Sequence, residues 1–324
     1  MTDLVLARLR RVEKERYAAL AALAVLTAFA AFMSPFFLTP QNLLNILRQV
    51  SYTGIIALGM TFVIVAGGID LSVGSMAAFV GSISVLLLNA AVARGHADGL
   101  SVAAAVACAV VLGLAGGLAN GLLVTKGRIA PFIVTLGTMA LFRSLSLYLG
   151  DAGEFRSTSM AFGELGSAAL LGIPLPALVL LALAAALSLL FTRTRYGRYV
   201  RAVGSNARVA RYSAIDVDLV RLGTYALAGL MVGVSAVLIA MRFNSVGTST
   251  LGVNYELDAI AAVIIGGTAM SGGRGTVWGT VIGAVILGVI NNMLNMVGIS
   301  PYLQGTVKGL VIIGAVFIQR QRQS

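Results

Sequence analysis

Apolar residues run through this chain in ten segments that are separated by short polar breaks. The segments span residues 17–38, 53–67, 72–93, 100–124, 129–149, 168–192, 221–241, 257–272, 276–297 and 302–319. A helix needs roughly 20 mostly apolar residues to cross the hydrocarbon of a bilayer, so this pattern predicts an all-α integral membrane protein of about ten transmembrane helices. The second and eighth segments are short and end in glycines, which predicts half-length or broken helices there.

Lys and Arg are unevenly divided between the two sides of the membrane that this pattern defines. If the N-terminus is cytoplasmic, 17 of the 23 basic residues lie on the inner side and four lie in outer loops. Basic residues gather on the cytoplasmic side of membrane proteins, so both termini are predicted to be cytoplasmic, with residues 1–16 as an inner segment. The apolar run 17–38 is too long for a signal-peptide core and is interpreted as an uncleaved first span.

Composition fits one transmembrane domain that covers residues 1–324. The chain is 58% hydrophobic and 11% charged, with a mean hydropathy of +0.95, whereas soluble domains usually carry about 25% charged residues. The net charge of +11 reflects the inner side of a membrane protein and does not indicate nucleic-acid binding, because no basic patch lies in a soluble domain.

The chain has few residues that could form a catalytic, metal-binding or nucleotide-binding site. The single cysteine, Cys108, and the single histidine, His96, lie far apart, so neither a metal site nor a nucleophilic dyad is expected. None of the three lysines is followed by Ser or Thr, which excludes an ATP-binding phosphate loop of the Walker type. We therefore expect no catalytic residue, no cofactor and no enzymatic activity.

The break after the second apolar segment is the most distinctive string in the chain. Paired glycines end one helix, and an acidic or hydroxyl side chain can cap the next helix by accepting bonds from its free amides. This predicts a structural cap, and a role in gating or substrate passage is the alternative. The candidate residues are Gly67, Gly68, Asp70, Ser72 and Gly74.

Three strings resemble the permease subunits of ribose-, xylose- and galactose-type ABC importers. They are GMTFVIVAGGIDLSVGS (59–75), PFIVTLGTMALFRS (131–144) and ELDAIAAVIIGGTAMSGGRGTVWGT (256–280). The resemblance runs from about residue 40 to residue 320. It implies a permease in the bacterial cytoplasmic membrane that gives a small neutral sugar a path across the bilayer.

The same resemblance implies partners. They are a second permease chain, identical or similar, a cytoplasmic ABC ATPase that hydrolyses the ATP, and an extracytoplasmic sugar-binding protein. Two alternatives stay open: a permease for another solute, such as a nucleoside or a branched-chain amino acid, and a secondary transporter that works alone.

The inner segment 192–220 is the second informative stretch. Its pattern predicts a short capped helix with a small apolar face and flanking arginines. Such a helix either docks in a groove on a soluble partner or rests on anionic lipid. The resemblance implies docking on the ATPase. The candidate coupling residues are Gly204, Ser205, Asn206, Ala207, Arg208, Ala210, Arg211, Ser213, Ala214 and Ile215. The family usually has glycine at position 214, so Ala214 must adopt a positive φ or the turn must differ.

Uncharged polar residues on the predicted helices are candidates for lining a pore. They are Asn120, Asn291, Asn292 and Asn295, of which Asn291 and Asn295 share a helical face by their i, i+4 spacing. Hydrogen bonding between helices explains such residues equally well.

Overall fold

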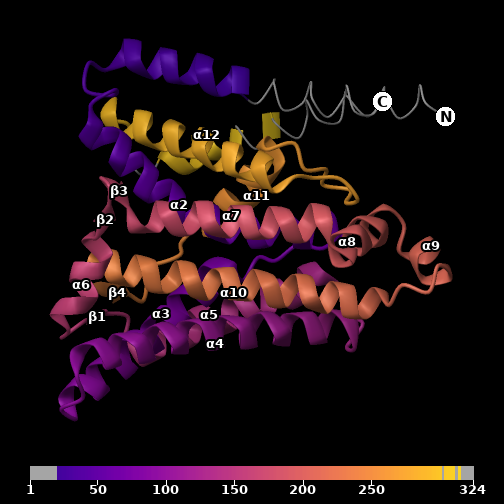
Figure 1. Cartoon of the computed structure of the whole chain (residues 1–324), viewed down its shortest axis with the longest axis horizontal. Helices are drawn as coiled ribbons and strands as arrows, with labels where there is room; N and C mark the ends of the chain where they lie inside the picture. Colours follow the sequence, from indigo (N-terminus) through magenta and orange to yellow (C-terminus); the bar gives the residue numbers. More distant parts are fainter. Residues whose placement is uncertain (1–19, 301–302, 311–312, 315–324) are drawn as a thin grey trace.

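The computed structural model describes residues 20–300, 303–310 and 313–314, which form a bundle of long helices (Figure 1). Within these residues, seven helices are long and apolar enough to cross a membrane. They are α2 (Pro40–Val65), α3 (Val73–Ala93), α4 (Asp98–Thr125), α5 (Pro131–Leu149), α7 (Leu175–Arg193), α10 (Val217–Phe243) and α12 (Val277–Met296). The prediction of an all-α polytopic membrane protein is confirmed, whereas the number of ten spans is not.

Shorter elements complete the described chain. The helical ones are Leu20–Met33, α6 (Met160–Ser167), α8 (Arg195–Ser205), α9 (Ala207–Tyr212), α11 (Tyr255–Ile265) and residues 303–310. The strands are β1 (Glu154–Arg156), β2 (Ala169–Leu170), β3 (Ile173–Pro174) and β4 (Ser245–Gly247). Strand β1 pairs antiparallel with β4, and β2 pairs antiparallel with β3.

These short elements distinguish the two ends of the bundle. The strands and α6 lie at one end, here called the strand end, and α8 and α9 lie at the other, here called the α9 end (Figure 1). The apolar segment predicted at 168–192 starts in the β2–β3 hairpin, and its helix begins only at Leu175.

Helix α2 corrects the expectation of a short second span. It begins at Pro40, because a proline at the first helical position needs no amide partner, and it continues for 26 residues. In its most apolar stretch, 83% of the residues are buried inside the bundle, against 22% for α5. The apolar segment 53–67 is only the second half of this helix, because the first half carries polar residues that face protein.

Helix α11 confirms the expectation of a short eighth helix. It ends at Ile265 after 11 residues, and the chain stays non-helical until α12 begins. Helices α2 and α11 end in the same way: the amides of Gly67 and Gly267 each donate at 2.9 Å to carbonyls of the last turn, on Ile64 and Ile264. Both glycines have positive φ, of 80° and 88°, as the αL ending of a helix requires.

Helices α4 and α10 pack with their backbones in close contact. Gly113 and Gly117 on α4 face Gly229 and Gly233 on α10, and a Cβ on Gly117 would lie 2.9 Å from the Cα of Gly229. Small residues four apart permit such approach between membrane helices. This pairing makes α10 the inner support for α2 and α3, which enclose the sites described next.

Candidate functional site

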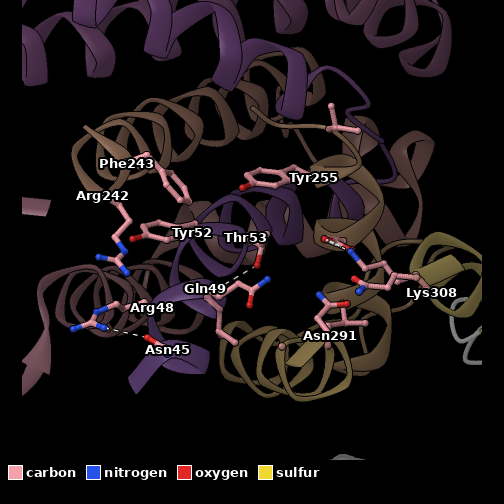
Figure 2. A pocket seen from close by; sticks show the side chains of 16 residues that line it. Asn45, Arg48, Gln49, Tyr52, Thr53, Arg242, Phe243, Tyr255, Asn291 and Lys308 are labelled. Carbon is pink, nitrogen blue, oxygen red and sulfur yellow. Dashed lines mark hydrogen bonds and ion pairs between the residues drawn. The ribbon is translucent and has the colours of Figure 1, made fainter. Parts of the chain in front are cut away.

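A polar stripe follows the first half of α2. The side chains of Asn45, Arg48, Gln49, Tyr52 and Thr53 recur at three- and four-residue spacing, so they share one face of the helix. This face lines a cavity of about 460 Å³ in the strand-end half of the bundle (Figure 2).

The other walls of this cavity come from four elements. They are the last turn of α10 (Arg242, Phe243), the start of α11 (Tyr255, Asp258), the middle of α12 (Leu287, Gly288, Asn291) and the helical residues Gln304 and Lys308. Because α11 is short and begins deep in the bundle, the space beyond its N-terminal end is left to polar side chains. A volume of several hundred Å³ with a few placed polar groups is typical of a small-molecule site.

Lys308 and Asp258 form an ion pair in the cavity wall. Lys308 Nζ lies 2.9 Å from Asp258 Oδ2, and their side chains are 19% and 10% exposed. Among residues 20–300, 303–310 and 313–314, no other ion pair joins two elements of the membrane bundle: Arg156–Glu154 lies within a strand and Arg211–Asp218 at the α9 end. The pair neutralises the acid in the wall and ties residues 303–310 to α11.

Two residues of the cavity wall each carry a polar atom that has no hydrogen-bond partner among the residues that the structure describes. Tyr52 Oη and Asn291 Oδ1 are both buried, and their residues are only 6% and 9% exposed. Asn291 is thus the asparagine of the predicted pore set that reaches the cavity. A buried polar group normally has a partner, so these two atoms point to a polar guest.

The neighbouring asparagines of α12 serve other contacts. Asn292 exchanges two hydrogen bonds with Asn42 of α2, at 2.7 and 3.0 Å. Asn295 accepts a 2.7 Å bond from Gln304. Neither residue lines this cavity, and both make the hydrogen bonds between helical segments that were the alternative to a pore role.

A long connection from the strand end leads to the start of α11. Residues 244–254 run from α10 into the bundle, where Arg143 of α5 donates to the carbonyls of Thr248 at 2.9 Å and Leu251 at 3.0 Å. Gly74 lets this connection approach α3, because a Cβ there would collide with the carbonyl oxygen of Gly252. Arg143 lies in the apolar segment 129–149, and its role follows only from the fold.

Asp70 lies in a buried polar cluster between α2 and α3. Its Oδ1 accepts bonds from the amide of Ser72 at 2.9 Å and from the Ser72 hydroxyl at 2.6 Å. Asn120 of α4 donates to Ser72 Oγ at 2.8 Å, and the hydroxyl of Tyr225 on α10 donates to the carbonyl of Ile69 at 3.0 Å. The cluster therefore fastens the break 66–72 to two neighbouring helices.

This geometry corrects two expectations. Neither Asp70 nor Ser72 caps the first turn of α3, whose amides receive no side-chain bond. Asn120 does not line the cavity, because it is fully buried in the cluster. The reason is the same in both cases: the break is folded inward, so its polar groups satisfy one another rather than a helix end or a pore.

The inner segment 192–220 includes α8 and α9, which are both capped by side chains. Asn206 Oδ1 accepts from the amides of Arg208 at 3.0 Å and Val209 at 3.1 Å, which confirms the predicted N-cap of the short helix. Ala214 has a φ of +58°, so the chain keeps the turn without glycine, at the conformational cost that a positive φ carries for alanine. Ser213 ends α9 by donating its hydroxyl to the Val209 carbonyl.

Of the predicted coupling residues, Ala210 is turned inward, whereas Ser213 and Ala214 are exposed. Ala210 is 3% exposed and packs within the protein, so it cannot approach a partner. The residues that stand out are Val209 and Tyr212, 57% and 83% exposed and one helical turn apart. Arg208 and Arg211 are exposed beside them.

A junction of glycines joins α8 to both glycine-ended helices. The amide of Gly273 donates to the carbonyl of Val65 at 2.8 Å, which brings the loop after α11 to the end of α2. Gly204 of α8 lies against both: a Cβ there would be 1.7 Å from Val65 O and 2.6 Å from Gly273 N. Gly204 and Ser205, predicted as coupling residues, therefore contact the membrane bundle itself.

Comparison with known proteins gives one consistent family. The profile described as branched-chain amino acid transport system / permease component matches residues 42–316. The ribose import permease of Bacillus subtilis is 44% identical over 302 residues, covering 93% of this chain and 91% of the relative. The D-allose permease of Escherichia coli is 38% identical over 94% of this chain and 92% of the relative, and its galactose/methyl galactoside permease is 38% identical over 91% and 90%.

The matches cover nearly the whole described bundle, including the glycine junction, the cavity and the α8–α9 segment. The sequence identity and the coverage of these matches are higher than a shared fold alone produces. Together with seven apolar helices of spanning length, they establish a multi-pass membrane protein. The chain belongs to the family of ABC-importer permease components that includes the ribose, allose and galactose import permeases.

Proposed function

We propose that this chain carries a small neutral sugar of the ribose, allose and galactose class through the bacterial cytoplasmic membrane, as one of two permease subunits. The observation that supports this most directly is the cavity of about 460 Å³, whose walls carry amides, hydroxyls and paired charges deep within a membrane bundle. Polyhydroxy compounds are bound by side chains that both donate and accept hydrogen bonds.

A branched-chain amino acid is the second candidate, since the family profile carries that description. A zwitterion needs a free anion and a free cation at its two ends. In the cavity wall, Asp258 is the acid, and it is already bonded to Lys308. This pairing leaves no free acid in the wall for an ammonium group, although Arg48 and Arg242 also line the cavity. A solute without an ammonium group is therefore favoured, in agreement with the names of the sugar permeases that this chain resembles.

The α9 end is assigned to the cytoplasm. The distribution of basic residues supports this side, because the inner segment 192–220 is rich in arginine. The cavity then faces the opposite side, where an extracytoplasmic binding protein would deliver the sugar. Accessibility labelling of single-cysteine variants at Tyr212 and Leu171, both highly exposed, tests this assignment: reagent added outside intact cells must reach only the second position.

Energy is supplied by a separate ATPase that docks on α9 through Val209 and Tyr212. An exposed aromatic and an aliphatic side chain one turn apart, flanked by arginines, form an apolar anchor with a charged rim. Ala214 and Asn206 hold this face in place, the first through the turn after α9 and the second through its cap.

Reconstitution of the chain in proteoliposomes with an ATPase and a ribose-binding protein tests the whole proposal. Uptake of labelled D-ribose should require all three components and ATP, and the chain alone should neither hydrolyse ATP nor accumulate sugar. Uptake by the chain alone would instead identify a secondary transporter. Uptake of L-leucine but not of D-ribose would assign the amino acid as the solute.

A further inference from the structure

The cavity wall holds two buried atoms whose hydrogen-bonding capacity is unused. Tyr52 Oη and Asn291 Oδ1 have no partner within the described residues, although both side chains are at least nine-tenths buried. Leaving such groups unpaired in an apolar surrounding is unfavourable, so a partner from outside the chain is expected at each. Tyr52 and Asn291 both line the same cavity, which offers a place for such a partner.

The chemistry of the two atoms defines the guest. Tyr52 Oη offers a hydroxyl that donates or accepts, and Asn291 Oδ1 offers a carbonyl that only accepts. One sugar carries several hydroxyls, each of which both donates and accepts, so its chemistry matches that of both groups. We propose that Tyr52 and Asn291 form a binding site for a neutral polyol within the permease itself, distinct from the site on the binding protein.

The surroundings of these atoms agree with that ligand. The rings of Phe243 and Tyr255 border the same cavity and give the apolar faces of a sugar a surface to pack against, while Gln49 adds a further amide (Figure 2). The Lys308–Asp258 pair removes the acid in the wall as a partner for a cationic ligand. The volume is of the order of ligand pockets that enclose a small molecule.

The position of the site gives it a role in transport. It lies between the strand end and the N-terminal end of α11, so a sugar held there has left the outer surface but has not passed α11. This inference rests on the proposed sugar-permease function, because it assigns two residues within that path. It predicts that the permease selects hydroxylated solutes a second time, after the binding protein has done so.

Ligand-observed NMR on the full-length chain in lipid nanodiscs tests the site without the binding protein. Saturation transfer to D-ribose should be seen with the wild-type chain and should be absent with L-leucine. Loss of one hydrogen bond weakens binding about three- to tenfold, so Tyr52→Phe and Asn291→Leu should each lower the apparent affinity by that factor. Met293→Leu, two positions further along the same helix and outside the cavity wall, is the control and should bind as the wild type does.

The outcomes separate the inference from the proposed function. If the wild-type chain gives no D-ribose signal at concentrations where the control sugar permease of B. subtilis does, or if Tyr52→Phe and Asn291→Leu bind unchanged, the site is refuted, even when the assembled importer takes up sugar. Tyr52→Phe removes a single oxygen and serves as the deciding variant if Asn291→Leu fails to fold. Absence of sugar uptake by the assembled wild-type importer refutes the proposed function instead.

Discussion

Gly204→Ala adds one carbon atom at the place where α8 meets the membrane bundle. The added Cβ would lie 1.7 Å from the carbonyl oxygen of Val65 and 2.6 Å from the amide nitrogen of Gly273, whereas real Cβ contacts essentially never fall below 3.0 Å. The two sides must therefore separate by about 1.3 Å. That displacement also strains the Gly273–Val65 hydrogen bond, which is 2.8 Å long.

The cost follows from these contacts. Forcing an extra carbon into a packed interior costs about 1–3 kcal/mol, and weakening one backbone hydrogen bond adds about 1 kcal/mol. The exposed face of α9 is untouched, so an ATPase should still bind. We expect the variant chain to unfold at a lower temperature and the assembled complex to hydrolyse ATP while transporting little sugar, because α8 no longer rests on the ends of α2 and the α11–α12 loop.

The assay is D-ribose uptake per ATP hydrolysed in proteoliposomes, together with co-purification of the ATPase. Gly137→Ala is the matched control: its added Cβ meets nothing within 4 Å, and alanine is a better helix former than glycine, so uptake should be unchanged. If Gly204→Ala takes up as much sugar per ATP as the wild type does, the contact between α8 and the ends of α2 and the α11–α12 loop does not transmit the ATPase motion. Loss of ATPase binding would show that the substitution distorts α9 instead.

Three further predictions concern neighbouring parts of the structure. Tyr212→Ala, which removes the most exposed ring of α9, should reduce ATPase co-purification at least tenfold, the effect of about 1.4 kcal/mol, while the chain still inserts; unchanged binding would refute the docking face. Ala214→Gly should raise stability by about 1 kcal/mol, since it relieves the positive φ, and a lower melting temperature would contradict this. Asp70→Asn keeps an acceptor for Ser72 and should fold normally, whereas Asp70→Leu leaves the Ser72 amide unpaired at a cost of about 1–3 kcal/mol; if Asp70→Asn folds but abolishes uptake, the charge itself functions in transport.

The sequence was sufficient where local chemistry decides the structure. Apolar segments located the spanning helices, the short capped helix predicted in 192–220 is α9, and the expected departure at Ala214 appears as a positive φ. Glycines in the second and eighth apolar segments adopt the same helix ending, at Gly67 and Gly267.

The functional site was harder to predict from the sequence, because it depends on which other helix each helix face contacts. The polar residues before position 53 hid the first half of α2, although their three- and four-residue spacing was the signal for a helix with one polar face. The pairing of Asn292 with Asn42, 250 positions away, and the hold of Arg143 on a distant connection follow only from the tertiary fold. Likewise, nothing in the local pattern showed that Ala210 points inward.

The burial of α2 has a consequence for how the protein is made. Among the seven spanning helices within the described residues, α2 has the lowest mean hydropathy and the largest buried share. Its polar face is sheltered by α10, α11 and α12, which are synthesised more than 150 residues later. A helix of this kind partitions into lipid less favourably than its neighbours do. We therefore expect α2 to stay beside the insertion machinery during translation. Its polar face is buried only after the C-terminal third of the chain has been synthesised and inserted.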